Sequence, residues 1–327
     1  MRRPFPDTEV WQRGCTVWYL PGMTFIGIEI GGTKLQVVAG HADGRIIDRR
    51  RLAVDAAAGG EGIRGQIAGV LPELKAAHRP AAVGVGFGGP VDWRTGRICC
   101  SHQVMGWHDF PLGDWLARES GLPVFVDNDA NVAAFGEALH GSGKGRSPVF
   151  WINMGSGVGG GLVVDGQIFH GAVPGECEIG HVRLDKSGVT VEERCAGWAV
   201  DRRIREVAAH HPKGPLGRRV SGMNGGEARH LAAALMEGDP AAQAILSELA
   251  DNLGFALSHG VQLMHPEVVV VGGGLSLVGE PLRAAMAEAL GRYVMDSFQP
   301  GPEVRLAGLG EDSVPVGALA LAARRLG

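Results

Sequence analysis

Four short segments, in a set order along the chain, constrain its fold more than any other feature. They are GIEIGGTK at 27–34, DNDA at 127–130, GSGVGGG at 155–161 and VGGG at 271–274. Three are glycine-rich turns that leave apolar strands, where backbone N–H groups can approach phosphate oxygens without a Cβ in the way. The segment at 127–130 supplies clustered carboxylates. This arrangement is typical of phosphoryl transfer.

The composition limits the class of protein. With 327 residues and 45% apolar content, the chain can bury large cores and is expected to form two domains or lobes. Its 53 glycines cluster after apolar runs, which excludes collagen and low-complexity chains. The net charge of -4 offers no basic surface for nucleic acid or an anionic membrane. A small-molecule partner is favoured.

The cysteines indicate a reducing compartment, because they form an odd set without a C-x-x-C pair. They are Cys15, Cys99, Cys100, Cys177 and Cys195. No apolar run reaches the roughly 18 residues of a membrane span, and the chain start lacks the apolar core of a signal peptide. We therefore expect a cytoplasmic protein whose residues 1–23 form an N-terminal tail outside the fold.

The pattern of apolar runs repeats once along the chain. Each copy predicts three strands, the first two flanking a glycine turn, then a helix and a further strand. The strands are expected at 24–30, 35–39, 45–54 and 81–87, then at 149–153, 161–164, 167–169 and 267–271, with helices near 63–74 and 240–264. The fold class is α/β, with lobes at 24–128, joined by a C-terminal helix at 313–327, and at 129–312. Ligands preferentially bind in a cleft between lobes.

Two stretches match the G-x-G-x-x-G pattern of dinucleotide-binding folds, Gly84 to Gly89 and Gly155 to Gly160. That fingerprint must close a strand and open a helix. The first stretch runs into Pro90 and the second into a strand, so neither qualifies. A P-loop is excluded as well, because the only Gly-Lys pair that could suit one, at 143–144, is followed by glycine.

From residue 24 to residue 320 the sequence resembles the ROK family of sugar kinases and sugar-responsive repressors, which have the actin-like ATPase (ribonuclease H-like) fold. Five segments carry the likeness. They are the first phosphate motif at 27–34, the catalytic-aspartate segment at 126–134, the second phosphate motif at 155–161, the sugar-binding signature at 178–181 and the adenosine motif at 269–274.

The resemblance implies that Asp129 is the general base for the attacking sugar hydroxyl. A hydroxyl is a poor nucleophile at neutral pH, and a positioned carboxylate can remove its proton in the transition state. From local sequence alone, Asp129 is equally well suited to cap a helix. Asn128 is implied to hold a sugar hydroxyl, with turn formation as its alternative.

Further sugar contacts are implied in other loops. Glu178 and His181 lie three apart, which places them on one face of a helix; a solvated glutamate and a packed histidine are the alternative. Glu192 resembles the family's further sugar-binding glutamate, although the adjacent Glu193 leaves the register open. The other implied contacts are Gly89 and Gln103, the latter standing where the family often has asparagine.

ATP and Mg²⁺ are the implied cofactors, and tight turns are the alternative explanation for the glycines. The implied phosphate and adenosine contacts are Gly31, Gly32, Thr33, Lys34, Gly155, Ser156, Gly157, Gly272, Gly273 and Gly274. Glu29, where the family commonly has aspartate, is implied to hold Mg²⁺, directly or through water.

Zinc is not expected, because the family's cysteine cluster is missing between residues 182 and 191. Cys177, His181 and Cys195 are an alternative ligand set, but their spacing matches no standard pattern.

The leading expectation is ATP-dependent phosphorylation of a free hexose, most simply glucose at its 6-hydroxyl. A fructokinase or N-acetylhexosamine kinase is the alternative within the family, because pocket shape sets the sugar. A repressor needs a DNA-binding module, for which about 23 weakly basic residues before the first strand are too few. A non-catalytic sugar sensor is a third hypothesis, against which Asp129 and the phosphate loops argue. A homodimer is expected by resemblance alone.

Overall fold

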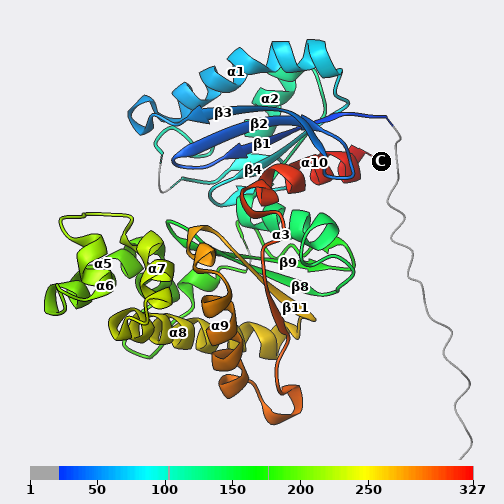
Figure 1. Ribbon diagram of the computed structural model, residues 1–327. Helices are drawn as coiled ribbons and strands as arrows, with labels where there is room; N and C mark the ends of the chain where they lie inside the picture. The colour runs from blue at the N-terminus through cyan, green and yellow to red at the C-terminus, as the bar shows by residue number, and fades with distance from the viewer. Residues whose placement is uncertain (1–21, 102–103, 176, 327) are drawn as a thin grey trace, which may run out of the picture.

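The computed structural model describes residues 22–101, 104–175 and 177–326. Most of the expected N-terminal tail, and Gln103, lie outside these residues. Figure 1 shows two α/β lobes, each built on one five-stranded sheet. The predicted α/β class with two similar lobes is confirmed. Within the described ranges, every helix is too short or too polar to span a bilayer.

The first lobe has a mixed sheet in the order β3-β2-β1-β4-β7. Its strands are β1 Phe25–Ile30, β2 Lys34–Gly40, β3 Ile46–Ala53, β4 Val83–Phe87 and β7 Val124–Asn128. β1 pairs antiparallel with β2 and parallel with β4. The β1–β2 turn closes through the N–H of Gly31, which donates to the Lys34 carbonyl at 2.9 Å. This is the glycine hairpin that the sequence predicts.

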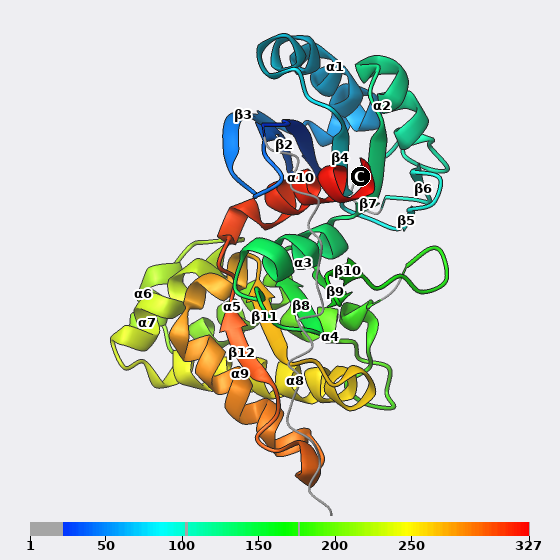
Figure 2. The ribbon, with the colours of Figure 1, turned by 90° about the vertical axis from the view of Figure 1, so that its right-hand side faces the viewer.

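Helices cover both faces of the first sheet, as Figure 2 shows. They are α1 Gly59–His78 and α2 Leu112–Ser120 on one face and α10 Ser313–Leu326 on the other. Ile63, Ile67, Leu71 and Leu74 form the buried stripe of α1. A small hairpin of β5 Val91–Asp92 and β6 Arg97–Ile98 lies beyond β4.

The second lobe has a mixed sheet in the order β10-β9-β8-β11-β12. Its strands are β8 Val149–Met154, β9 Val158–Val164, β10 Gln167–Ile168, β11 Val268–Gly272 and β12 Glu303–Leu306. Successive residues of β8 face two cores: Trp151 packs toward α3, whereas Ile152 packs toward the core of α8. The sheet is therefore buried on both faces.

The helices of the second lobe include α3 Asp129–His140, α4 Val191–Cys195, α5 Gly197–His210, α6 Pro215–Val220, α7 Leu231–Met236, α8 Pro240–Met264 and α9 Glu280–Tyr293. Short 3₁₀ turns are η1 Ala56–Ala58, η2 Ile179–His181, η3 Glu227–His230, η4 Gly274–Val278, η5 Asp296–Phe298 and η6 Gly310–Asp312. In Figure 1, α5, α6 and α7 lie to one side of the sheet, and α8 and α9 lie below it.

Most predicted strand boundaries differ from the structure by one or two residues, and the start of β9 differs by three. The strand predicted from 161 begins at Val158, so only residues 155–157 of the second glycine motif form the turn. The later glycines instead allow α3 to lie close against β9, since a Cβ at Gly161 would come within 2.8 Å of the Ala130 carbonyl oxygen. Glycine here serves helix-to-sheet packing.

Two connections join the lobes: the step from β7 into α3, and the segment 307–313 between β12 and α10. The helices that follow them, α3 and α10, pack directly on each other (Figure 1). Gly317 permits this, because a Cβ there would lie 1.8 Å from the Val132 carbonyl oxygen. Both connections therefore meet at one helix pair beside the cleft, while the lobe limits at 128 and 129 stay a prediction.

Candidate active site

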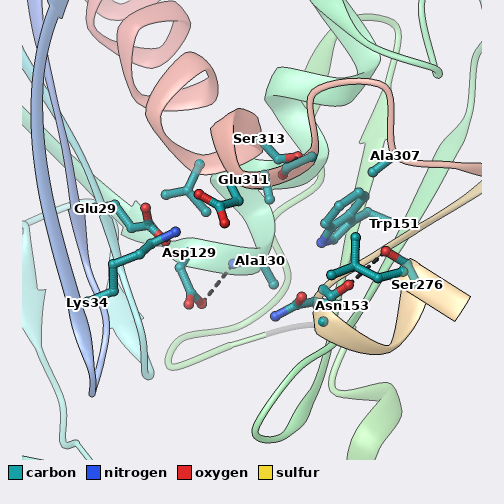
Figure 3. Close-up of a pocket in the computed structure, with 16 residues that line it drawn as sticks. Glu29, Lys34, Asp129, Ala130, Trp151, Asn153, Ser276, Ala307, Glu311 and Ser313 are labelled. Atoms are coloured by element: carbon teal, nitrogen blue, oxygen red, sulfur yellow. Dashed lines mark hydrogen bonds and ion pairs between the residues drawn. The ribbon is translucent and has the colours of Figure 1, made fainter. Parts of the chain in front are cut away.

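A cavity of about 280 Å³ lies between the lobes, at the start of α3. In Figure 3, Asp129 lies near its centre, with Glu29 and Lys34 on one side and Asn153 and Ser276 on the other. Glu311, from the connection to α10, faces the same space. Elements distant in sequence thus place three carboxyl groups and one ammonium around one cavity.

Asp129 is the first residue of α3, but it is not the residue that caps the helix. The cap is Asn128, whose Oδ1 accepts the N–H groups of Ala130 at 2.9 Å and Asn131 at 3.3 Å. Asp129 Oδ1 accepts the same Ala130 N–H at 2.8 Å, and its Oδ2 lies against Gly88. The carboxyl is therefore held at the helix N-terminus and directed into the cavity (Figure 3).

Burial is the main reason that the pKa of Asp129 rises to about 7. The nearby charge of Glu29, and to a lesser extent that of Glu178, raises the pKa further, while the Ala130 N–H lowers it. A carboxyl with a pKa near neutrality exchanges a proton readily at physiological pH. Its position and its acidity both suit a general base.

Glu29 lies on β1 and is held by two neighbours. The Lys34 ammonium is 3.1 Å from its Oε1, and Gln36 Nε2 donates to its Oε2 at 2.7 Å. Burial raises the pKa of Glu29, and Lys34 and Gln36 oppose the rise. Arg49 donates to Gln36 Oε1 at 3.1 Å, so the carboxylate is oriented from β3 through β2.

The charge around this cavity fits a magnesium ion bound with a nucleotide. Glu29, Asp129 and Glu311 line it together with a single lysine, and oxygen ligands of this kind are those that Mg²⁺ prefers. Mg²⁺ commonly takes one or two carboxylates and completes its shell with phosphate and water. Within the described ranges no three His, Cys, Asp or Glu side chains form a closed metal-binding group.

Three of the predicted sugar contacts, Asn128, Gly89 and Glu178, lie near Asp129. Asn128 Nδ2 donates to the Gly89 carbonyl at 3.1 Å, which joins two of them directly. Since Asn128 Oδ1 is used in capping, one amide hydrogen remains for a ligand. Glu178 precedes the 3₁₀ turn η2, and its carbonyl accepts the His181 N–H at 3.0 Å. Residues at this spacing share one face of a 3₁₀ turn.

The adjacent residues Glu192 and Glu193 make different contacts. Glu193 closes a capping box with Thr190, accepting its N–H at 2.8 Å. Glu192 Oε2 instead accepts the Val158 N–H at 2.9 Å and lies against Gly157. Glu192 is therefore the glutamate that reaches the second glycine turn, and its implied contact with the sugar stays a prediction.

A second cavity, of about 600 Å³, opens beside the first in the second lobe. Gly274 and Leu277 line both cavities, so the two adjoin at η4. Gly155 and Ser156 form part of its wall, and Trp198 forms another part. Leu277 is 83% exposed and Trp198 44% exposed, although both are large and apolar. Such side chains, exposed in a cavity, suit a flat apolar ligand such as a nucleobase.

Sequence reasoning did not find Trp198, Leu277, Asn153 or Glu311. Asn153 is the penultimate residue of β8, two residues before the first glycine of the predicted turn. Leu277 follows the third glycine motif by three residues. The position of Asn153 and Leu277 close to glycine motifs was the sequence feature that could have indicated them as site residues. Glu311 carried no local signal, because only the return of α10 brings it to the cleft.

The predicted glycines divide into two groups. Gly31 and Gly155 use their N–H groups within their own turns, donating to the carbonyls of Lys34 and Gly157 at 2.9 Å each. Gly272 lies against the Trp151 ring and is not among the residues lining these two cavities. Gly31 and Gly272 therefore serve the turn and the packing in the described structure, whereas Gly155 also lines the second cavity. Their ligand contacts stay predictions.

Other glycines of the same motifs do face the cavities. Gly273 has φ +83°, and a Cβ there would meet Asn153 Oδ1 and the Met154 backbone at 2.5 Å. Gly273 and Gly274 line the first cavity, and Gly274 the second as well. Gly32 and Thr33 lie at the tip of the β1–β2 turn.

The alternative zinc ligands do not lie together in the described part of the chain. Cys195 lies in the core of the second lobe with no exposed surface. Burial raises the pKa of its thiol to about 12. Cys177, His181 and Cys195 do not form a metal-binding group in the described structure.

The chain is similar to known proteins along nearly its whole length. Residues 25–325 match the ROK family. A glucokinase of Halalkalibacterium halodurans is 32% identical, over 90% of this chain and 93% of that protein. A glucokinase of Thermotoga maritima is 30% identical, over 94% of this chain and 100% of that protein. A ROK family glucokinase from Streptomyces griseus, solved in complex with glucose and AMPPNP, has a TM-score of 0.82 at 31% identity, covering 93% of this chain and 100% of that one.

Proposed function

Because this chain belongs to the ROK family, we propose that it phosphorylates a free hexose, most simply glucose at its 6-hydroxyl, with Asp129 as the general base. The chain has the actin-like ATPase fold and is an ATP-dependent sugar kinase. The proposal concerns the sugar and the residues that act on it. The observation that carries it is the position of Asp129 at the interlobe cavity with a pKa near 7.

In the proposed reaction, the Asp129 carboxylate accepts the proton of the sugar hydroxyl as its oxygen forms a bond to the γ-phosphorus. The bond from that phosphorus to the bridging oxygen breaks, and ADP leaves with its electron pair. The Ala130 N–H donates to Asp129 Oδ1 at 2.8 Å, which leaves Oδ2 to take the proton. The residue acts through position and basicity alone.

Glu29 is the residue proposed to hold Mg²⁺, directly or through water, with Lys34 beside it for the phosphates. When bound, Mg²⁺ offsets the charge of the nucleotide phosphates. Gln36 holds the Glu29 carboxylate at 2.7 Å and so keeps it pointed at the cavity.

The second cavity is proposed to take the adenosine of ATP. Trp198 and Leu277 offer apolar surface for the base, and Gly274 lies where the two cavities meet. Ser156 lines the cavity at the second glycine turn and is proposed to contact phosphate. Glucose and AMPPNP are bound in the solved Streptomyces griseus structure, which supports a paired sugar and nucleotide site in this chain.

The sugar is proposed to lie between Asn128 on the first connection and Glu178, His181 and Glu192 of the second lobe. Glu178 lies close enough to raise the pKa of Asp129, so a ligand held by Glu178 is near the base. Carboxylates and a histidine ring are suitable partners for sugar hydroxyls. Contacts from Gly89 and Gln103, a homodimer and a cytoplasmic location stay predictions.

The experiment that tests the function is ADP release from ATP and Mg²⁺ across a panel of glucose, fructose, mannose and N-acetylated hexosamines. We expect one sugar, glucose first, to stimulate ADP release strongly. A response to fructose or to an N-acetylhexosamine alone would replace glucose by that substrate. Silence across the panel, with sugar binding intact by calorimetry, would contradict the kinase proposal and favour a sensor.

The pKa of Asp129 predicts the pH dependence of catalysis. Below a pH of about 7 the carboxyl carries a proton and cannot accept another, so the rate should fall about tenfold for each pH unit of acidification. The measurement is the rate with both hexose and MgATP far below saturation, which reports the free enzyme. An acid limb centred near the ordinary aspartate pKa of 3.8 would contradict the assignment.

A further inference from the structure

A cluster beside the sugar-binding residues joins the two lobes. His170 follows β10 in the second lobe, and its Nε2 donates to Oδ2 of Asp127, at the end of β7, at 2.7 Å. The His170 ring also stacks on Trp93 of the β5–β6 hairpin, with ring centroids 4.1 Å apart and planes 18° apart. The side chains of His170 and Asp127 are 10% and 3% exposed. A buried hydrogen bond and a ring stack therefore act at one residue.

Asp127 directly precedes the residues that begin α3. Its Oδ1 accepts the backbone N–H of Asn128 at 2.8 Å and the side-chain amide of Asn131 at 3.1 Å. Together with His170, three donors orient this carboxylate. If the His170 donor is lost, the buried Oδ2 of Asp127 lacks this hydrogen bond. Leaving a buried charged group without a hydrogen bond costs free energy. The orientation of the Asn128 segment thus depends on a residue of the opposite lobe.

The loop that follows His170 leads to Glu178. His170 begins the loop that returns the chain to η2, and Pro174, Gly175 and Glu178 of that loop line a small cavity with Asn128 and Trp93. This cavity has about 10 Å³ of free volume, room for about one water molecule. The loop carrying Glu178 therefore packs closely on the hairpin and on the start of α3.

We propose that His170 is a positioning residue for the acceptor sugar, through its hydrogen bond to Asp127 and its stack on Trp93. It ties the loop of Glu178 to the strand that ends in Asn128, and so sets the distance between two groups that hold the sugar. This inference rests on the proposed function for its effect on the sugar. The tie itself is a property of the unliganded protein, and it can be measured separately.

Two variants of His170 separate the effect of its hydrogen bond to Asp127 from the effect of its stack on Trp93. His170→Phe keeps a flat ring against Trp93 and removes the hydrogen bond, whereas His170→Gln keeps an amide donor for Asp127 and removes the ring. We expect His170→Phe to raise the KM for the hexose at least tenfold and the KM for ATP less than threefold. We expect the hexose KM of His170→Gln to be within threefold of wild type. His259→Phe, an exposed histidine beside Phe255 on α8, is the matched control. A hexose KM unchanged in His170→Phe, or both KM values raised equally, would overturn the proposal.

Hydrogen exchange in the absence of ligands tests the tie without reference to catalysis. We expect the backbone amides of 171–173, 175 and 177–180 to exchange at least tenfold faster in His170→Phe than in wild type or the His259→Phe control. Unchanged exchange in this segment would overturn the tie. If the wild type phosphorylates no hexose, the proposed function fails while the exchange result still decides the tie. If His170→Phe does not fold, the same comparison is made with His170→Gln. Because this variant loses only the stack on Trp93, we expect a smaller increase in the amide exchange rate, confined to this segment. An unchanged exchange rate in His170→Gln would then overturn the proposal.

Discussion

Replacing Asp129 by asparagine is expected to lower kcat by about 10³-fold and to leave sugar and ATP binding within threefold of wild type. Asparagine has nearly the same shape, so it can still accept the Ala130 N–H that holds the side chain at 2.8 Å. It cannot accept a proton at any accessible pH. The loss therefore falls on the chemical step. The measurement is steady-state ADP release together with calorimetric binding of each substrate.

The control for this variant is Asp114→Asn. Asp114 is also in the first turn of a helix, α2, but it is exposed and lies outside both cavities. We expect wild-type kcat for Asp114→Asn, and no acid limb near pH 7 in the residual activity of Asp129→Asn. A kcat above about a tenth of wild type in Asp129→Asn would rule out Asp129 as the base.

Replacing Glu137 by alanine is expected to lower the free energy of unfolding by about 3–5 kcal/mol. Glu137 is on α3 and has no exposed surface. Its carboxylate accepts the N–H groups of Ser142, Gly308 and Leu309 and the Ser313 hydroxyl, at 2.8–3.0 Å. Removing it leaves the buried Ser313 hydroxyl and three partly buried N–H groups without this acceptor, and a buried donor left unpaired costs about 1–3 kcal/mol. Denaturant unfolding measures the loss.

The same carboxylate fixes the connection between β12 and α10, so activity should fall as well. Ser313 and the neighbouring Glu311 line the interlobe cavity, and Glu137 holds this segment in place from α3. Glu288→Ala is the control: Glu288 is 80% exposed and pairs with Arg292 at 3.3 Å, so its removal should change stability by less than about 0.5 kcal/mol. A loss below about 1 kcal/mol in Glu137→Ala would contradict the assigned role.

Local sequence was sufficient to predict most of the secondary structure. The helix expected at 240–264 is α8, Pro240–Met264, where Asp239 caps and Pro240 begins the helix. Apolar periodicity and capping depend on residues only a few positions apart, so helix positions and ends can be predicted from the local sequence. The start of β9 was missed because glycines suited to a turn are here held in a strand by pairing with β8.

The sequence alone determined the α/β class and the family resemblance, because these depend on residue types at fixed spacing. That resemblance implied Asp129, Glu178 and Glu192 as candidate site residues, with Glu193 left as an alternative to Glu192. The structure decided that Asn128 caps α3 while the Asp129 side chain lines the cavity. It also decided the pKa of Asp129, which depends on burial and on Glu29, a residue of another element. Desolvation and Coulomb interactions act through space, so residues distant in the chain set them only after the two lobes have packed together.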